Sequence, residues 1–196
     1  MKRVIVSVVS LCIVFAGCAT TKPQLTREEW LDTTTRYYDG VSKDEVLKAA
    51  ERLFRLADGN DFKIVHAEDE LYATRNWLVY VVLAAASGTD YWRVTTKSAQ
   101  NGVKVSVQVN TQSQTIAPMA TTSGSWTATT LPMAGTPVQG TAIYDVFWAR
   151  MDYLLGKRTD WMDCKQAGER VKKGITWGLN EALCNCFNIK DDKPSP

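Results

Sequence analysis

Four valines occupy every second position of residues 103–109, directly after the dipeptide Asn101-Gly102. Asn-Gly is the strongest short signal for a two-residue hairpin turn, and a period of two places alternate side chains on opposite faces of a strand. The valines therefore predict a strand with one buried face, whose polar residues, Lys104 and Gln108, face water. A similar alternation over residues 92–97 predicts the preceding strand of the hairpin.

Two segments have helical periodicity. Ser42 and Glu45 have the spacing of a capping box, and Gly59 stands where a C-terminal cap is expected. Between them the apolar positions are Val46, Ala50, Leu53, Phe54 and Ala57. The second helix is predicted for about 140–155 and ends at Gly156. Its broad apolar stripe, which is more typical of a core than of a cofactor site, contains Ile143, Tyr144, Phe147, Trp148, Met151, Leu154 and Leu155.

The remaining strands are predicted from shorter patterns. Residues 33–38 read as a first strand, and Phe62, Ile64 and His66 alternate in a second. Residues 71–86 begin as an alternating strand and become a continuous apolar run from Trp77. This run is too short to cross a bilayer, so it favours a long buried strand or a strand with a curled end. Residues 87–90 (Ser-Gly-Thr-Asp) predict the turn that follows.

This order of elements predicts an α+β fold: an antiparallel sheet with two helices on one face, over residues 32–157. Residues 158–196 are expected to form a short cysteine-containing appendage, with a basic patch around Arg170, a helical turn at 179–186 and a frayed tail.

The N-terminal residues have the pattern of an export signal. Lys2 and Arg3 precede thirteen uncharged, mostly apolar residues, fewer than the about 17–25 that a transmembrane helix needs. The sequence Phe15-Ala16-Gly17-Cys18 resembles the lipobox of bacterial lipoproteins, with Phe15 where Leu is usual. That resemblance implies removal of residues 1–17 and acylation of Cys18; an uncleaved anchor or an ordinary secretory signal is the alternative.

The same resemblance implies where the protein resides. Ala19 follows the cysteine, where an Asp would resemble the inner-membrane retention signal of enterobacteria. We therefore expect a periplasm-facing protein held on the outer membrane by lipid, with residues 18–31 as its tether. Without Lys2 and Arg3 the 23 basic residues fall to 21, which equals the 21 acidic ones. A neutral chain of this kind has no electrostatic footprint for nucleic acid.

Three cysteines remain after Cys18 is used and Cys12 is removed: Cys164, Cys184 and Cys186. In an oxidising compartment we expect one disulfide from Cys164 to either Cys184 or Cys186, and the sequence does not choose between them. A site with three thiolate ligands is the less favoured alternative, because the only histidine, His66, is far away in sequence. We predict no metal and no cofactor.

Residues 111–137 contain no charged residue and are rich in Ser, Thr, Ala, Gly and Pro. A long irregular segment of this kind is usually disordered or functional. It nevertheless carries four apolar side chains that a solvated linker would lack: Met119, Trp126, Leu131 and Met133. These side chains are expected either to pack over the sheet edge or to bind a partner or a membrane.

Motifs for catalysis are scarce. The sequence has no G-x-S-x-G, H-E-x-x-H, P-loop or G-x-G-x-x-G pattern. His66 is expected to be a structural histidine, and the adjacent acids Glu68, Asp69 and Glu70 are more typical of a solvated turn than of a paired-carboxylate site. We therefore predict that the protein is not an enzyme.

The lipobox and the order of elements together resemble the helix-grip domains of small envelope lipoproteins, including the lipoprotein subunit of the outer-membrane β-barrel assembly machine. The resemblance covers about residues 32–155 and rests on Thr35-Arg36-Tyr37, 46–56 and 102–109. It implies a non-catalytic scaffold or accessory subunit that binds envelope proteins. The alternative is a binder of a small or lipidic ligand in a cavity between the sheet and helix 140–155, lined by Trp77, Tyr80, Phe147 and Trp148.

Overall fold

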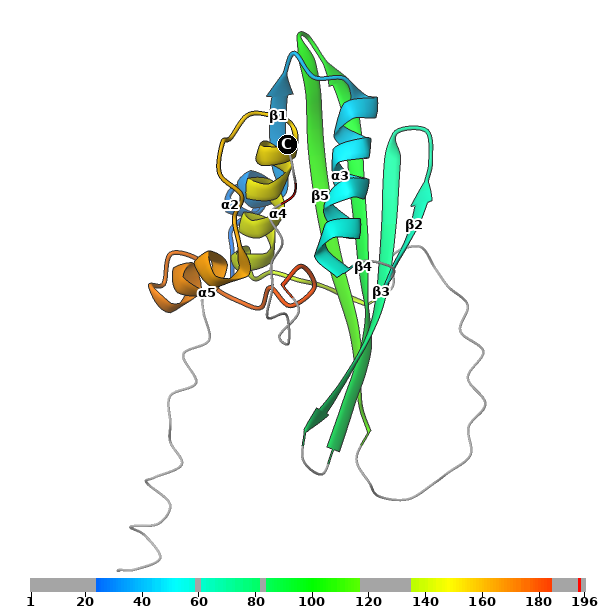
Figure 1. The fold of residues 1–196 in the computed structure, drawn as a ribbon, viewed down its shortest axis with the longest axis vertical. Coiled ribbons are helices and arrows are strands. Elements are labelled where there is room, and N and C mark those ends of the chain that lie inside the picture. Colours follow the sequence, from blue (N-terminus) through cyan, green and yellow to red (C-terminus); the bar gives the residue numbers. More distant parts are fainter. Residues whose placement is uncertain (1–23, 59–60, 82–83, 117–134, 185–193, 195–196) are drawn as a thin grey trace, which may run out of the picture.

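The fold is a curved antiparallel sheet with helices packed against one of its faces (Figure 1). The structure is a computed structural model and describes residues 24–58, 61–81, 84–116, 135–184 and 194. In these residues the elements are α2 (Arg27–Thr34), β1 (Thr35–Asp39), α3 (Lys43–Asp58), β2 (Phe62–His66), β3 (Glu70–Val81), β4 (Ala84–Ala99), β5 (Gly102–Ile116), β6 (Thr136–Pro137), α4 (Thr141–Leu154) and α5 (Cys164–Lys172). The predicted α+β class is confirmed.

The strands lie in the order β1-β5-β4-β3-β2, and the short β6 also pairs with β5. The predicted Asn101-Gly102 hairpin is confirmed, since β4 ends at Ala99 and Ala99 pairs with Gly102. The valines of β5 at positions 103, 105, 107 and 109 are at most 3% exposed, whereas Lys104 between them is exposed. The period of two thus sets which face of the sheet the core occupies.

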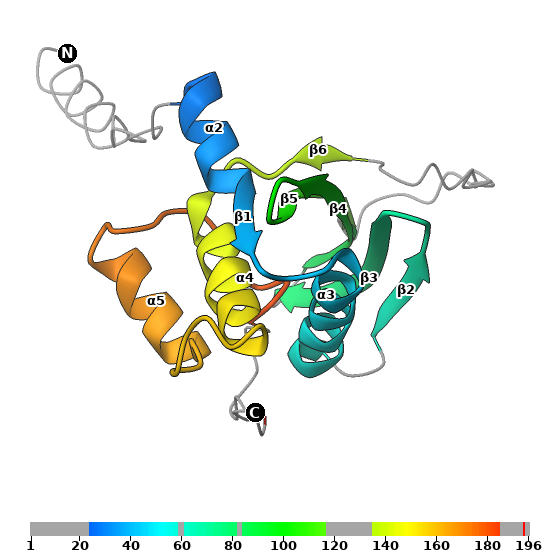
Figure 2. The ribbon, with the colours of Figure 1, turned by 90° about the horizontal axis from the view of Figure 1, so that it is seen from above.

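The core lies between that face and two helices. Figure 2 shows α3 and α4 side by side on one side of the sheet. The Trp92 side chain from β4 is completely buried between Phe54 of α3 and Phe147 of α4, with ring centroids 5.1 and 5.6 Å from its own. The buried stripes of both predicted helices meet here, so that the two helices and the sheet share one aromatic core.

Hydrogen bonds at the N-termini explain where two helices begin. The Ser42 hydroxyl accepts from the Glu45 backbone N–H, and the Glu45 carboxylate accepts from the Ser42 N–H at 2.8 Å, which is the predicted capping box of α3. Thr26 and Glu29 form the same arrangement at α2. Because α2 continues to Thr34, the strand predicted to begin at residue 33 begins instead at Thr35.

The turn predicted at residues 87–90 is wrong. These residues belong to β4, and the chain reverses between Val81 and Ala84, which divides the predicted strand 71–86 into β3 and the start of β4. Gly88 is needed for space rather than for a turn, because a Cβ atom there would lie 2.4 Å from the Trp77 ring and from the Gln112 carbonyl oxygen.

The segment 111–137 is less irregular than predicted. Residues 111–116 continue β5 in register with β4, and 136–137 form β6 opposite Asn110 and Thr111. Residues 111–115 are all polar and lack the alternation of residues 103–109, which is why composition alone suggested a loop. The four apolar candidates of this segment lie outside the described residues.

The C-terminal appendage packs against α4. Its helix is α5, capped by a box between Asp163 and Gln166, whereas the described part of the predicted helix at 179–186 forms turns. The predicted disulfide is present and joins Cys164 to Cys184, with Cα atoms 5.5 Å apart.

A buried arginine holds the two ends of the appendage. Arg150 of α4 is 1% exposed, and its guanidinium donates to the carbonyl oxygens of Met162 and Leu183, both at 3.1 Å. It also contacts the Cys164 sulfur at 3.3 Å. The Arg150 guanidinium therefore lies beside the disulfide and hydrogen-bonds the backbone next to each of its two cysteines.

Candidate functional site

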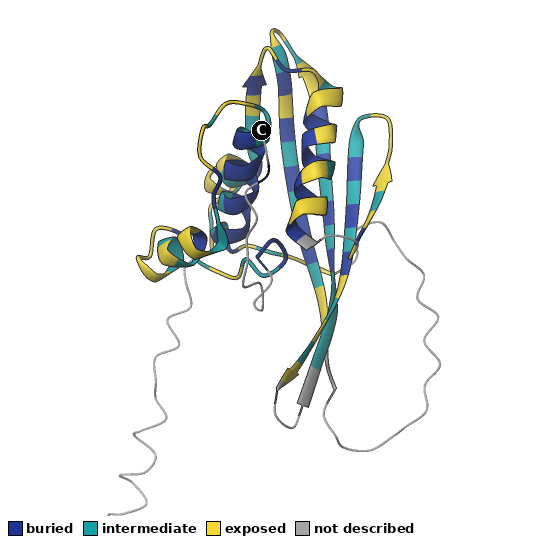
Figure 3. Ribbon diagram, viewed as in Figure 1, coloured by how far each residue is buried: buried dark blue, intermediate teal, exposed yellow. Residues whose placement is uncertain are grey.

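Three strands extend past the helices at the end of the sheet opposite the Asn101-Gly102 turn (Figure 1). We call this part the arm: residues 76–81 of β3, 84–89 of β4 and 112–116 of β5. At about 3.3 Å per residue, its two six-residue strands, β3 and β4, project roughly 20 Å. Figure 3 shows that burial decreases along these strands as they leave the helices.

The arm carries no charge and exposes large apolar side chains. No Asp, Glu, Lys or Arg occurs in residues 76–89 or 105–144. Leu78 is 50% exposed and Tyr80 is 77% exposed, on the face of the sheet opposite the helices. A surface of this composition is unusual for a solvated strand and typical of an interaction site.

The strand edges of the arm are open among the described residues. Pairing of β2 with β3 stops at Phe62 and Arg75, so residues 76–81 pair only with β4. On the other side, β6 pairs with β5 only at Asn110 and Thr111. An open edge presents backbone donors and acceptors to an added strand.

A buried ion pair forms the base of the arm. Arg75 of β3 and Asp90 of β4 are direct cross-strand partners, and each is 6% exposed. The Asp90 carboxylate accepts from Arg75 at 3.2 Å, from the Trp77 indole at 3.3 Å and from Thr111 at 3.0 Å. Arg75 also donates to the Glu181 carbonyl oxygen at 3.1 Å. The network joins all three strands of the arm to the appendage.

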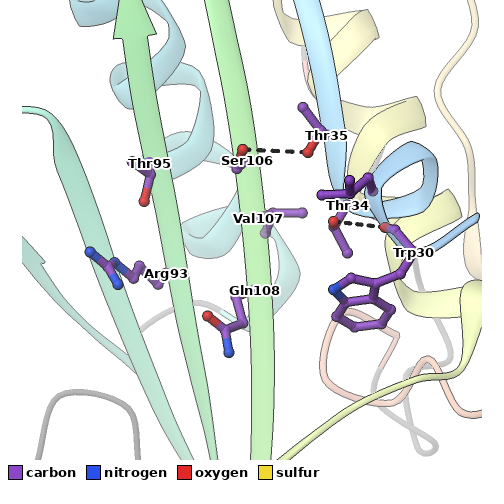
Figure 4. A pocket seen from close by; sticks show the side chains of 9 residues that line it. Trp30, Thr34, Thr35, Arg93, Thr95, Ser106, Val107 and Gln108 are labelled. Atoms are coloured by element: carbon purple, nitrogen blue, oxygen red, sulfur yellow. Dashed lines mark hydrogen bonds between the residues drawn. The ribbon is translucent and has the colours of Figure 1, made fainter. Parts of the chain in front are cut away.

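A shallow pocket of about 170 Å³ lies where α2 meets the face of the sheet that the helices α3 and α4 leave open (Figure 4). It is located beside β5, between the stretch that pairs with β1 and the stretch that pairs with β6. The residues around it come from four elements: Trp30, Leu31 and Thr34 of α2, Thr35 of β1, Arg93 and Thr95 of β4, and Ser106, Val107 and Gln108 of β5.

The charge at this pocket is balanced. Arg93 donates from Nε to Glu70 at 3.2 Å, and Glu70 also accepts from Tyr72 and from Thr95. The hydrogen bond from Arg93 lowers the pKa of Glu70 below its ordinary value, and the bond to Glu70 raises the pKa of Tyr72. The guanidinium and the carboxylate therefore stay paired beside the pocket.

Of the residues considered for catalysis from the sequence, His66, Asp69 and Glu70 have structural partners, and Glu68 is exposed. His66 lies in β2 and bonds through Nε2 to Glu51 of α3 at 2.8 Å, which links the sheet edge to the helix. Asp69 pairs with Lys43 at 2.8 Å, and Glu70 belongs to the cluster beside the pocket. The described residues contain no group of three or more His, Cys, Asp or Glu side chains arranged to hold a metal ion.

The four residues predicted to line a ligand cavity do not come together. Phe147 and Trp148 are at most 2% exposed in the filled core, whereas Tyr80 points into solvent on the arm. Trp77 lies over Gly88 and donates to Asp90. These four side chains therefore line no common cavity, because the uncharged strand passes beyond the helices instead of lying beneath them.

No described helix is long and apolar enough to span a membrane. Cys18, Cys186, Met119, Trp126, Leu131 and Met133 lie outside the described residues. The sequence pointed to segment 111–137 as the partner-binding element, and it missed Leu78 and Tyr80, whose uncharged run was interpreted as a buried strand.

No protein-family model, curated protein or solved structure significantly matches the chain.

Proposed function

We propose that the protein is a lipoprotein anchored to the outer membrane through Cys18 and facing the periplasm, where it acts as a non-catalytic scaffold or accessory subunit. Its partner is an envelope protein, bound at the arm. The observation that carries this proposal is an uncharged, three-stranded projection with exposed Leu78 and Tyr80 and open strand edges.

The arm suits a protein partner. An extended segment of another chain can add to an open strand edge through main-chain hydrogen bonds, and side-chain pockets then supply specificity. Residues 76–81 offer such an edge, with Leu78 and Tyr80 next to it on one face. Natural edges are commonly protected by Lys, Pro or a covering loop, and the sequence of this stretch contains neither Lys nor Pro.

The sequence of the N-terminus supports the anchor. Hydrophobic transfer contributes about 0.8 kcal/mol for each buried CH₂, so several acyl chains hold a protein on a membrane far more firmly than one. A tethered domain of this kind meets envelope partners without a transmembrane segment.

Replacing Cys18 with Ala tests the anchor. We expect the variant to incorporate no labelled fatty acid and to lose its acyl attachment to the outer-membrane fraction, because its thiol is the proposed acylation site. Fatty-acid labelling followed by membrane fractionation measures both effects. Incorporation of label into the variant would rule out the lipobox interpretation.

Replacing Leu78 and Tyr80 together with Asp tests the arm. Charge on this surface should reduce capture of the native partner by at least tenfold, while folding and lipidation persist because both side chains are exposed. Capture is measured by chemical cross-linking in envelopes, followed by affinity purification of the lipidated protein.

The matched control is Val65→Asp. Val65 is 53% exposed, on the same face of the sheet, but it lies on β2 outside the arm. This variant should capture the same proteins at the wild-type yield. Equal yields from the double variant and the wild type would contradict the arm as the contact surface.

A further inference from the structure

We propose that the pocket between α2 and the open face of the sheet binds one ring of a neutral saccharide. Trp30 forms its apolar wall, and Thr95, Ser106 and Gln108 form its polar floor. This inference is independent of the partner site on the arm, because the two sites share no residue.

Charge favours a neutral ligand. Among the described residues, Arg93 is the only charged residue that lines the pocket, and its guanidinium is paired with the Glu70 carboxylate. The pair presents no net charge, so the pocket lacks the uncompensated cation that would select a phosphate or carboxylate. A ligand whose polar groups are hydroxyls fits this balance.

The polar lining matches a polyol. Hydroxyl and amide side chains both donate and accept hydrogen bonds, as sugar hydroxyls do. Ser106 and Thr35 contact each other only at 3.4 Å, and Gln108 donates to Asn110 at 3.3 Å. Among the described residues no donor reaches the Gln108 carbonyl oxygen, which leaves an acceptor available at the pocket.

Trp30 is fixed in place before any ligand arrives. Its ring lies nearly perpendicular to the Tyr144 ring, with centroids 5.6 Å apart, and the Thr34 hydroxyl donates to the Trp30 backbone carbonyl oxygen at 2.8 Å. The Trp148 indole donates to the Thr33 carbonyl oxygen at 2.7 Å and fastens the end of α2 to α4. A rigid indole beside hydroxyl and amide groups suits the C–H face and the hydroxyl rim of a pyranose, and it limits the entropy lost on binding.

The position of the pocket disfavours a peptide. The backbones of β4 and β5 pair with one another beneath it, and among the described residues the β5 edge left between β1 and β6 is only residues 107–109, too short to pair with an added strand. Its volume of about 170 Å³ is below the roughly 300–1,000 Å³ of pockets for drug-sized ligands. A single ring of a longer glycan, lying along the open sheet face, is the ligand that fits these limits.

The test is calorimetric titration of the full lipidated chain in a detergent without sugar head groups. The probes are a tetramer of N-acetylglucosamine and a tetramer of glucose; stronger binding of one identifies the glycan class. Gln108→Ala should weaken binding about tenfold, consistent with the loss of one hydrogen-bonding group. The nearly isosteric Thr95→Val should also weaken it.

The matched control is Lys104→Ala, an exposed residue on the same strand and face but outside both the pocket lining and the arm. It should bind within twofold of the wild type. The proposal is overturned if neither tetramer binds, if Lys104→Ala and Gln108→Ala have equal effects, or if inorganic phosphate displaces the sugar. None of these outcomes bears on the arm, whose test uses envelope proteins.

Discussion

Replacing Trp92 with Ala should lower the free energy of unfolding by about 3–5 kcal/mol, the usual cost of removing a large aromatic side chain from a core. Trp92 is completely buried and joins the two helices to the sheet through Phe54 and Phe147. Its removal leaves a void where α3, α4 and β4 meet in one aromatic cluster. Urea denaturation monitored by circular dichroism measures the change.

The conservative variant Trp92→Phe sharpens this test. The indole N–H of Trp92 has no hydrogen-bond partner in the described structure, so phenylalanine removes an unsatisfied donor while it retains a six-membered ring. We expect it to cost less than half as much as alanine. If Trp92→Ala lowered the free energy of unfolding by less than about 1 kcal/mol, a filled aromatic core around Trp92 would be contradicted.

Replacing Asp90 with Ala should destabilise the protein by a similar amount, about 3–5 kcal/mol, because it removes the carboxylate from a buried ion pair. The Arg75 guanidinium would stay buried without this carboxylate, and the Trp77 and Thr111 side chains would lose their acceptor. The same denaturation experiment provides the value, and proteolysis of the arm provides an independent local measure.

Two further variants serve as comparisons for Asp90→Ala. Asp90→Asn retains an oxygen that accepts hydrogen bonds but loses the charge, so its effect should lie between those of wild type and Asp90→Ala. Asp160→Ala removes an exposed partner of Arg158, and such surface pairs contribute at most about 1 kcal/mol. Equal effects of Asp90→Ala and Asp160→Ala would mean that the base of the arm is solvated.

Local patterns predicted most of the fold. The capping box of Ser42 and Glu45, the Asn101-Gly102 turn and the alternating valines of β5 each act within a few residues, and each predicted its element. The side of the sheet that is buried followed from the same valines. Where the signal is local and periodic, sequence is sufficient.

Errors arose where tertiary contacts decide the role of a residue. Gly88 and Asp90 have the composition of a turn, but Gly88 makes room for the Trp77 ring and Asp90 neutralises Arg75 across the strands. The capping box of α5 was visible at Asp163 and Gln166 but was not recognised. Cys184 could not be selected over Cys186, because the choice depends on how the chain packs around Arg150.

The candidate sites were the least predictable part. Trp30, Arg93 and Gln108 are distant in sequence and meet only because β5 pairs with β4 and α2 packs beside it. The arm was predicted as a buried strand because an uncharged run favours burial, and the sequence does not show whether a helix of the same protein or a partner would bury it. A strand longer than the helices that cover it is a tertiary feature.

Site-specific cross-linking in intact envelopes tests the proposed partner site most directly. A photoreactive phenylalanine replaces Tyr80 on the arm in one full-length variant. In a second variant it replaces Tyr37, which is 51% exposed at the other end of the sheet. We predict a discrete protein adduct from position 80 and none from position 37. No protein adduct at position 80, or the same adducts at both positions, would contradict the proposal that the arm binds an envelope protein.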